Sequence, residues 1–186
     1  MSLACVVRAI LRAVPASADR PVLFLDVDGT LIPFGASSRA SGAVAGRPHD
    51  PRAAANPLLT RLNPVHGSQL LALPCDLVWA TTWMTDANDV IAPLLGLPCL
   101  PVVEWPDSDE DGPLHWKTRT LVEWAAGRPF IWVDDEIART DRLWVSAHHH
   151  GRALLHRVDP GQGLTSDDFT VLGDWLRAVA AGEQIE

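Results

Sequence analysis

The chain has 186 residues, of which 47% are hydrophobic and 20% are charged, and its formal net charge is -8. This length corresponds to about one domain with a buried core, and the apolar content excludes a wholly disordered chain. The negative charge argues against a broad surface for binding polyanions. No apolar stretch approaches the roughly 18 residues of a membrane helix, so we expect a soluble protein with no membrane partner.

The chain begins with a segment, residues 1–18, whose apolar character is interrupted by two arginines. This pattern predicts a short amphipathic helix instead of a secretion signal. The three cysteines show no metal-ligand spacing and are expected to be free thiols in a reducing compartment: Cys5, Cys75 and Cys99. Both features favour the cytoplasm.

Five short apolar segments are typical of strands that are buried on both faces. They lie at residues 22–25, 77–80, 99–103, 130–133 and 153–158. Apolar residues recur at helical spacing within residues 58–73, 86–95, 116–126 and 165–179. Because strands and helices alternate, we expect a single α/β domain over residues 1–186, a Rossmann-like three-layer sandwich with a mostly parallel five-stranded sheet and helices on both faces.

Two segments between these elements are predicted to be loops. Residues 33–56 are rich in Gly, Ser, Ala and Pro, which favours a long loop or flap. Residues 104–112 are acidic, and the spacing of Asp107, Asp109 and Asp111 copies the start of a calcium-binding loop. The twelfth position of that loop is a threonine where calcium requires a glutamate, so we prefer a solvated acidic loop, whose role is left open.

Polar residues follow three of the predicted strands, at the edge where ligands bind in parallel sheets. They are Asp26 and Asp28 after the first, Thr81 and Thr82 after the second, and Asp134 and Asp135 after the fourth. One carboxylate of the Asp26 and Asp28 pair could attack a phosphate ester while its neighbour carries protons, and Gly29 lets the chain turn sharply behind them. Lys117, the single lysine among 15 basic residues, could offset the negative charge together with Mg²⁺.

These residues carry a resemblance to a known family. Asp26-Val-Asp-Gly-Thr-Leu31, Thr81, Lys117 and Val133-Asp-Asp135 resemble the four ordered motifs of the haloacid dehalogenase (HAD) superfamily of phosphatases. Trp79-Ala-Thr-Thr-Trp83, Gly96-Leu-Pro98, Trp116-Lys-Thr118 and Trp132-Val-Asp-Asp-Glu136 are similar to the small phosphatase-like domains associated with multidomain RNA-repair proteins. The resemblance spans residues 22 to about 164.

The resemblance implies a role for each matched residue. Asp26 would be the nucleophile and an Mg²⁺ ligand, and Asp28 the general acid and base, with its backbone carbonyl also on the metal. Thr81 would bind the phosphoryl group, with Thr82 as the alternative and Gly29 among the neighbouring backbone groups. Lys117 would pair with Asp26 and the phosphate, while Asp134 and Asp135 would complete the metal site directly or through water.

The resemblance also implies an uncapped site. The positions where the superfamily inserts cap domains hold a helix at residues 118–128 and the flap at 33–56, and an open site favours exposed or macromolecular phosphates. Nucleic-acid ends fit that class, although the net charge disfavours them. We therefore expect a magnesium-dependent phosphomonoester hydrolase. A phosphotransferase of the same fold and a non-catalytic phosphate-binding module are the alternatives, and the physiological substrate and oligomeric state are left open.

The aromatic and histidine residues have plainer interpretations. Trp79 and Trp132 fall within predicted buried strands and are expected in the core. Trp83 and Trp116 flank the phosphate-binding candidates, so either core packing or a substrate surface is open to them. Three consecutive histidines, residues 148–150, are expected to form a solvated turn, since they cannot all face one metal ion.

Overall fold

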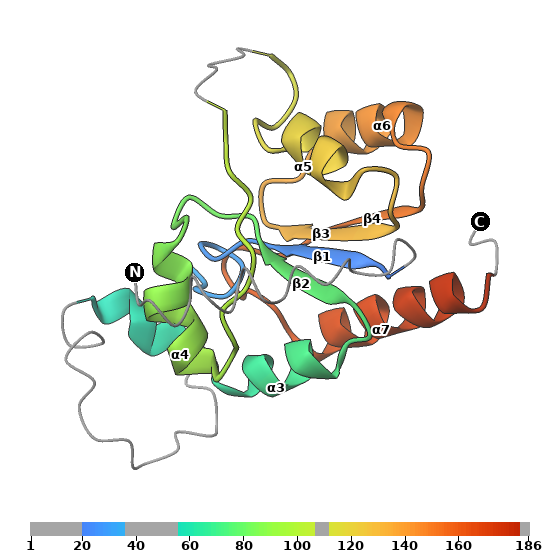
Figure 1. Cartoon of the computed structure of the whole chain (residues 1–186). Helices are drawn as coiled ribbons and strands as arrows, with labels where there is room; N and C mark the ends of the chain where they lie inside the picture. Colours follow the sequence, from blue (N-terminus) through green and yellow to red (C-terminus); the bar gives the residue numbers. More distant parts are fainter. Residues whose placement is uncertain (1–19, 36–55, 107–111, 183–186) are drawn as a thin grey trace.

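A parallel four-stranded sheet lies at the centre of the structure, a computed structural model that describes residues 20–35, 56–106 and 112–182. Its strands are β1 (Val22–Leu25), β2 (Asp76–Trp79), β3 (Phe130–Asp134) and β4 (Ala153–Arg157), in the order β2-β1-β3-β4 (Figure 1). The N-terminal strand β1 is therefore interior to the sheet. All four of its residues are buried, as the unbroken apolar run predicts.

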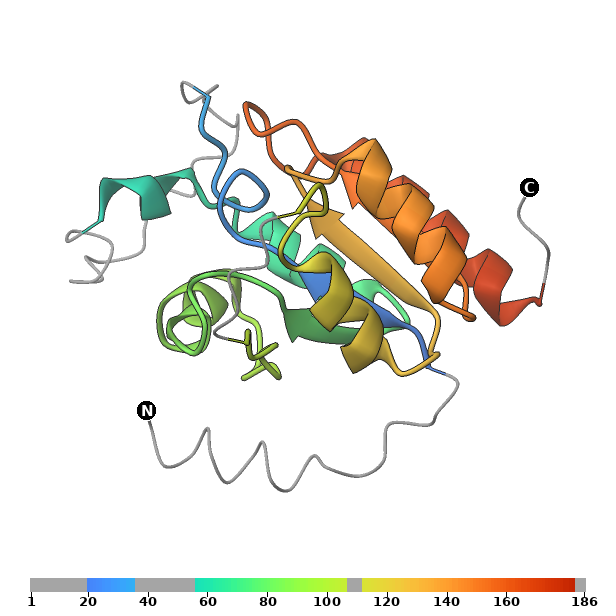
Figure 2. The same cartoon turned by 90° about the horizontal axis from the view of Figure 1, so that it is seen from above.

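Helices cover both faces of the sheet. They are η1 (Pro57–Arg61), α3 (Val65–Ala72), η2 (Ala87–Ile91), α4 (Ala92–Leu95), α5 (Thr118–Ala125), α6 (Arg139–His148) and α7 (Ser166–Ala180). One core contains Leu23 and Leu25 of β1 with α3, α4 and α7, and the other contains Val22 and Phe24 with α5 and α6. Figure 2 looks down onto α5 and α6. The fold is thus a Rossmann-like three-layer α/β sandwich, as predicted.

The strand expected at residues 99–103 is reduced to a single bridge between Val102 and Trp79. Pro101 has no amide hydrogen, so this segment cannot continue a ladder. Its carbonyl still accepts from the Trp79 amide at 2.9 Å. The Asn88 side chain fixes this segment in place of a ladder. It forms hydrogen bonds with the Trp79 indole nitrogen and with both backbone groups of Leu100 at 2.8–3.0 Å. The sheet therefore has four strands instead of five.

Helix α6 has no counterpart among the predicted helices. The residue that precedes it is Ala138, which has no side-chain acceptor to announce a helix start. The cap comes instead from Asp141 one turn later, whose Oδ2 accepts the Ala138 amide at 2.8 Å. In contrast, the capping box at Thr165 and Asp168 opens α7 as predicted.

Some sequence-based expectations fall outside the described residues, namely the helix at 1–18, most of the flap, the acidic residues 107–111 and the state of Cys5. Cys75 is buried and free, as the sequence predicts. His149 is buried with its Nε2 3.1 Å from the Arg128 carbonyl oxygen, which corrects the solvated turn. Within the described ranges, none of the helices combines the length and apolar character that crossing a membrane requires.

Candidate active site

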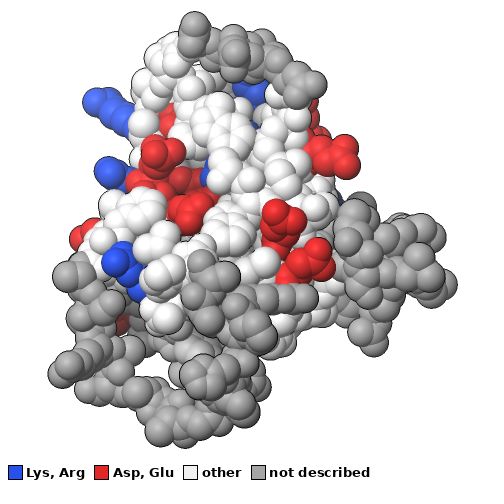
Figure 3. All heavy atoms as spheres, turned by 90° about the vertical axis from the view of Figure 1, so that its left-hand side faces the viewer, with Lys and Arg blue, Asp and Glu red and all other residues white. Residues whose placement is uncertain are grey.

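The carboxyl edge of the sheet brings the predicted acidic residues together. In the ladder, Leu25 of β1 pairs with Val133 of β3, so the next residues, Asp26 and Asp134, lie side by side. The Asp26 amide donates to the Val133 carbonyl at 3.1 Å and extends this register by one bond. Figure 3 looks onto this end of the sheet, where acidic side chains gather. Asp26 and Asp134 are buried because the strands that carry them are central.

Lys117 connects the two carboxylates. Its Nζ donates to Asp26 Oδ1 at 2.7 Å and to Asp134 Oδ2 at 2.8 Å, and the residue is only 4% exposed. A buried charge is tolerated only where it is paired, and this ammonium is paired twice. The structure thus joins three residues that are far apart in the sequence, as the prediction required.

Asp28 follows Asp26 by two residues and is half-buried. Its Oδ2 accepts a hydrogen bond from the Trp83 indole nitrogen at 2.9 Å. Of the two threonines that follow β2, Thr81 is fully buried and its hydroxyl accepts the Trp83 amide at 3.3 Å, whereas Thr82 is exposed. Trp83 therefore ties the turn after β2 to Asp28, a connection that sequence spacing alone does not reveal.

Gly29 is required by both conformation and space. Its φ is +70°, in the left-handed region that residues with a Cβ rarely adopt. A Cβ at this position would also overlap the Asp135 carboxylate. The glycine thus lets the loop after β1 pass directly against the loop after β3, which brings Asp135 to the other acidic residues.

The electrostatics of the site reflect an excess of buried negative charge. Burial, opposed by Lys117 and reinforced by Asp134, raises the pKa of Asp26 to about 7. Burial followed by the charge of Asp134 also raises the pKa of Asp135. For Lys117, burial acts to lower the pKa, but the two neighbouring carboxylates outweigh it and the pKa is raised. One ammonium among three carboxylates leaves two negative charges to be balanced by protons or by another cation.

Asp26, Asp134 and Asp135 could hold a metal ion, since each offers a carboxylate oxygen within 4.8 Å of the others. An all-oxygen donor set suits a hard cation such as Mg²⁺. The two unbalanced negative charges of this cluster match a divalent ion. The observed donor set therefore fits the predicted magnesium site.

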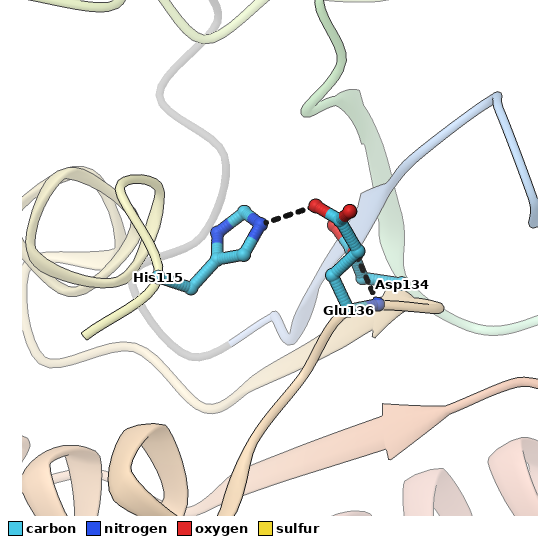
Figure 4. Close-up of side chains that lie close together, drawn as sticks. All are labelled: His115, Asp134 and Glu136. Atoms are coloured by element: carbon cyan, nitrogen blue, oxygen red, sulfur yellow. Dashed lines mark hydrogen bonds and ion pairs between the residues drawn. The ribbon is translucent and has the colours of Figure 1, made fainter. Parts of the chain in front are cut away.

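The ligand atoms of a second group, His115, Asp134 and Glu136, also lie within 4.8 Å of one another, but this group includes a histidine ring (Figure 4). The Lys117 amide donates to His115 Nδ1 at 3.2 Å, so the neutral ring carries its hydrogen on Nε2. That nitrogen faces Glu136 Oε2 at 3.1 Å and donates to it. With one ring nitrogen accepting and the other donating, His115 has no lone pair left for a metal. This group is a hydrogen-bond chain.

Lys117 is held in place by an aspartate that the sequence motifs do not include. Buried Asp141 of α6 accepts from the His115 amide at 2.8 Å and from the Thr118 hydroxyl at 2.7 Å, on either side of the lysine. The Trp132 indole nitrogen donates to Asp134 Oδ2 at 3.1 Å and fixes the second carboxylate. Asp141 could have been found from the sequence as an acidic residue in the first turn of a helix. That clue requires α6 to be recognised first.

Comparisons with known proteins identify the family of this chain. Residues 22–169 match the family described as the HAD domain in Swiss Army Knife RNA repair proteins. Curated proteins give no match. Among solved structures, the HAD domain of effector protein Lem4 from Legionella pneumophila has a TM-score of 0.45 and 10% sequence identity, covering 88% of this chain and 96% of that one. The family match covers most of the chain, all four strands and every predicted site residue, so the chain belongs to the family of HAD domains found in Swiss Army Knife RNA repair proteins.

Proposed function

We propose that this domain is a magnesium-dependent phosphomonoester hydrolase with Asp26 as nucleophile and Asp28 as general acid and base. The observation that carries the proposal is the buried Lys117 ammonium, 2.7 Å from Asp26 Oδ1 and 2.8 Å from Asp134 Oδ2. A cation fixed beside a carboxylate nucleophile can also stabilise charge that develops on a transferring phosphoryl group. Membership in a HAD family supports the same class of chemistry.

In the first step, the second carboxylate oxygen of Asp26 attacks phosphorus, and the bond from phosphorus to the leaving alcohol breaks. Asp28 gives its proton to the leaving oxygen, and an aspartyl phosphate remains on Asp26. In the second step, water attacks that phosphorus and its proton passes to Asp28, while the bond from phosphorus to the Asp26 oxygen breaks, which restores the Asp26 carboxylate and releases inorganic phosphate. The bond from Trp83 to Asp28 Oδ2 would keep the Asp28 carboxyl group in one orientation through both steps.

We propose that Asp26, Asp134 and Asp135, with the backbone carbonyl of Asp28, hold the Mg²⁺. The ion would supply positive charge to offset that of the phosphoryl oxygens. Thr81 and its neighbouring backbone groups, including those of Thr82 and Gly29, would bind the phosphoryl oxygens themselves.

The substrate class that we propose is an exposed phosphate at the end of a larger molecule. The family description refers to RNA repair, which points to a phosphate at an RNA end. The net charge of -8 opposes a long contact with a nucleic-acid backbone, so a terminal group is favoured over an internal one.

The test is phosphate release from a generic aryl phosphate, measured with and without Mg²⁺. Asp26→Asn removes the nucleophile and should abolish release, while Asp174→Asn, the same change at an exposed position on α7, serves as the matched control. Equal release by the wild type and Asp26→Asn would show that Asp26 is not the nucleophile. Acceptor alcohols added to the assay would reveal phosphotransfer as a second product.

A further inference from the structure

A groove of about 770 Å³ lies on the face of the molecule that carries α5 and α6. The residues that line it include Trp116, Arg119, Thr140, Leu143, Trp144 and His148. Two of these apolar side chains are unusually open to solvent, because Trp116 is 48% and Leu143 61% exposed. Large apolar residues with that much exposure, gathered along one groove, mark a binding surface more often than chance exposure does.

The groove begins beside the candidate active site. The Trp116 ring, which lines it, has its centroid 5.3 Å from the Nζ of Lys117. His115 also lines the groove, and its ring donates to Glu136, two residues beyond the site carboxylate Asp134. A molecule with a phosphate at Lys117 would therefore reach the groove by way of Trp116.

The walls of the groove are flat and rich in π-electrons. The Trp144 ring stacks on His148 with a centroid distance of 4.2 Å and an interplanar angle of 9°, and the Arg119 guanidinium carbon lies 5.1 Å from the same ring. Trp116 stacks on His115 at 5.5 Å with its exposed area directed to solvent. Planar heteroaromatic rings bind such surfaces by stacking.

We propose that this groove binds the nucleobase of a substrate nucleotide whose phosphate occupies the site at Lys117. The proposal rests on the proposed function, because that function places the phosphate. Stacking is also compatible with the negative net charge of the chain. The chain's charge opposes binding of a phosphate backbone, but stacking depends on contacts with the base and does not require basic residues that neutralise several phosphates. One terminal nucleotide is thus a better fit to this surface than an extended backbone.

Adenosine tests the groove without any dependence on turnover, since it has no phosphate to release. Calorimetric titration should show binding to the wild type that Trp116→Ala weakens about tenfold, within the range found for loss of a base-stacking ring. Trp116→Phe keeps an aromatic face and should retain most of the affinity. Leu143→Glu changes the groove on α6, away from Lys117, and should also weaken binding. Val171→Ala, on α7 at a residue 46% exposed, is the control.

Absence of adenosine binding, or equal binding by the wild type, Trp116→Ala and Leu143→Glu, overturns the proposal. If Asp26→Asn proves as active as the wild type while adenosine still binds the groove, the proposed function fails and the base site stands. The source of the nucleotide is then tested by measuring how tightly the Asp26→Asn protein binds two ligands. One is adenosine monophosphate, and the other is a short oligoadenylate that carries a terminal phosphate. Tighter binding of the oligonucleotide indicates nucleic-acid ends, equal binding indicates free nucleotides, and binding of both no tighter than inorganic phosphate refutes the base site.

Discussion

Replacement of Lys117 by methionine tests the electrostatic design of the site most directly. The side chain is 5% exposed, and the change removes the cation that lies between the Asp26 and Asp134 carboxylates. Removing one partner of a buried ion pair typically costs about 3–5 kcal/mol, because the remaining charges are buried without compensation. We therefore expect Lys117→Met to lower the free energy of unfolding in urea by about that amount and to lose turnover.

The same reasoning predicts that a second change recovers stability. Adding Asp26→Asn to Lys117→Met removes one of the two opposed carboxylates, so the double variant should be more stable than Lys117→Met alone while both are inactive. Lys117→Arg keeps the charge but must place a larger planar group in a closed site, and we expect it to fold with turnover reduced about 100-fold or more. Equal urea midpoints for the wild type, Lys117→Met and the double variant would refute this account of the buried charges.

Three further predictions concern neighbouring features. Trp83→Phe keeps an aromatic ring but removes the donor to Asp28 Oδ2, so kcat for an aryl phosphate should fall about tenfold. An unchanged kcat would leave Trp83 without a positioning role. Gly29→Ala must adopt a φ of +70° against a carboxylate and should lose about 2 kcal/mol of unfolding free energy, and a urea curve like that of the wild type would contradict this. His66 has its pKa lowered from 6.5 by burial, against the opposing charge of Asp168, so the unfolded state takes up the proton first as the pH falls. The contribution of His66 to stability should therefore be fully present above about pH 6.5 and decrease below it, so the difference in unfolding free energy between the wild type and His66→Gln should shrink in urea titrations as the pH falls. A difference that stays constant with pH would exclude His66 as a source of pH dependence.

The fold and the charged centre of the site could be read from the sequence because each depends on local pattern and topology. Asp26 and Asp134 end apolar runs, and parallel strands place their carboxyl ends at one edge. Lys117 could be assigned through the motif resemblance. The buried positions of these three residues in the structure agree with that reading.

The supporting contacts could not be read in this way because they join distant segments through side chains. Asp141 contacts the residues around Lys117 from a helix that begins without a recognisable N-cap. Asn88 replaces a strand ladder with three side-chain hydrogen bonds, so an apolar run at residues 99–103 looks like a strand without forming one. In both cases, tertiary contacts decide what local propensity leaves undetermined.

The sheet order has a consequence for the way the chain folds. Strand β1 comes first in the sequence, yet its second neighbour, β3, ends only at residue 134. During synthesis, Asp26 stays unenclosed until more than half of the chain has been made. Only then are Lys117, which follows 91 residues later, and the far side of the sheet present to bury it. Such long-range closure is slow compared with local helix formation, and it exposes the apolar β1 until it is complete. Shortened chains that end before β3 should therefore aggregate instead of forming a stable half-domain.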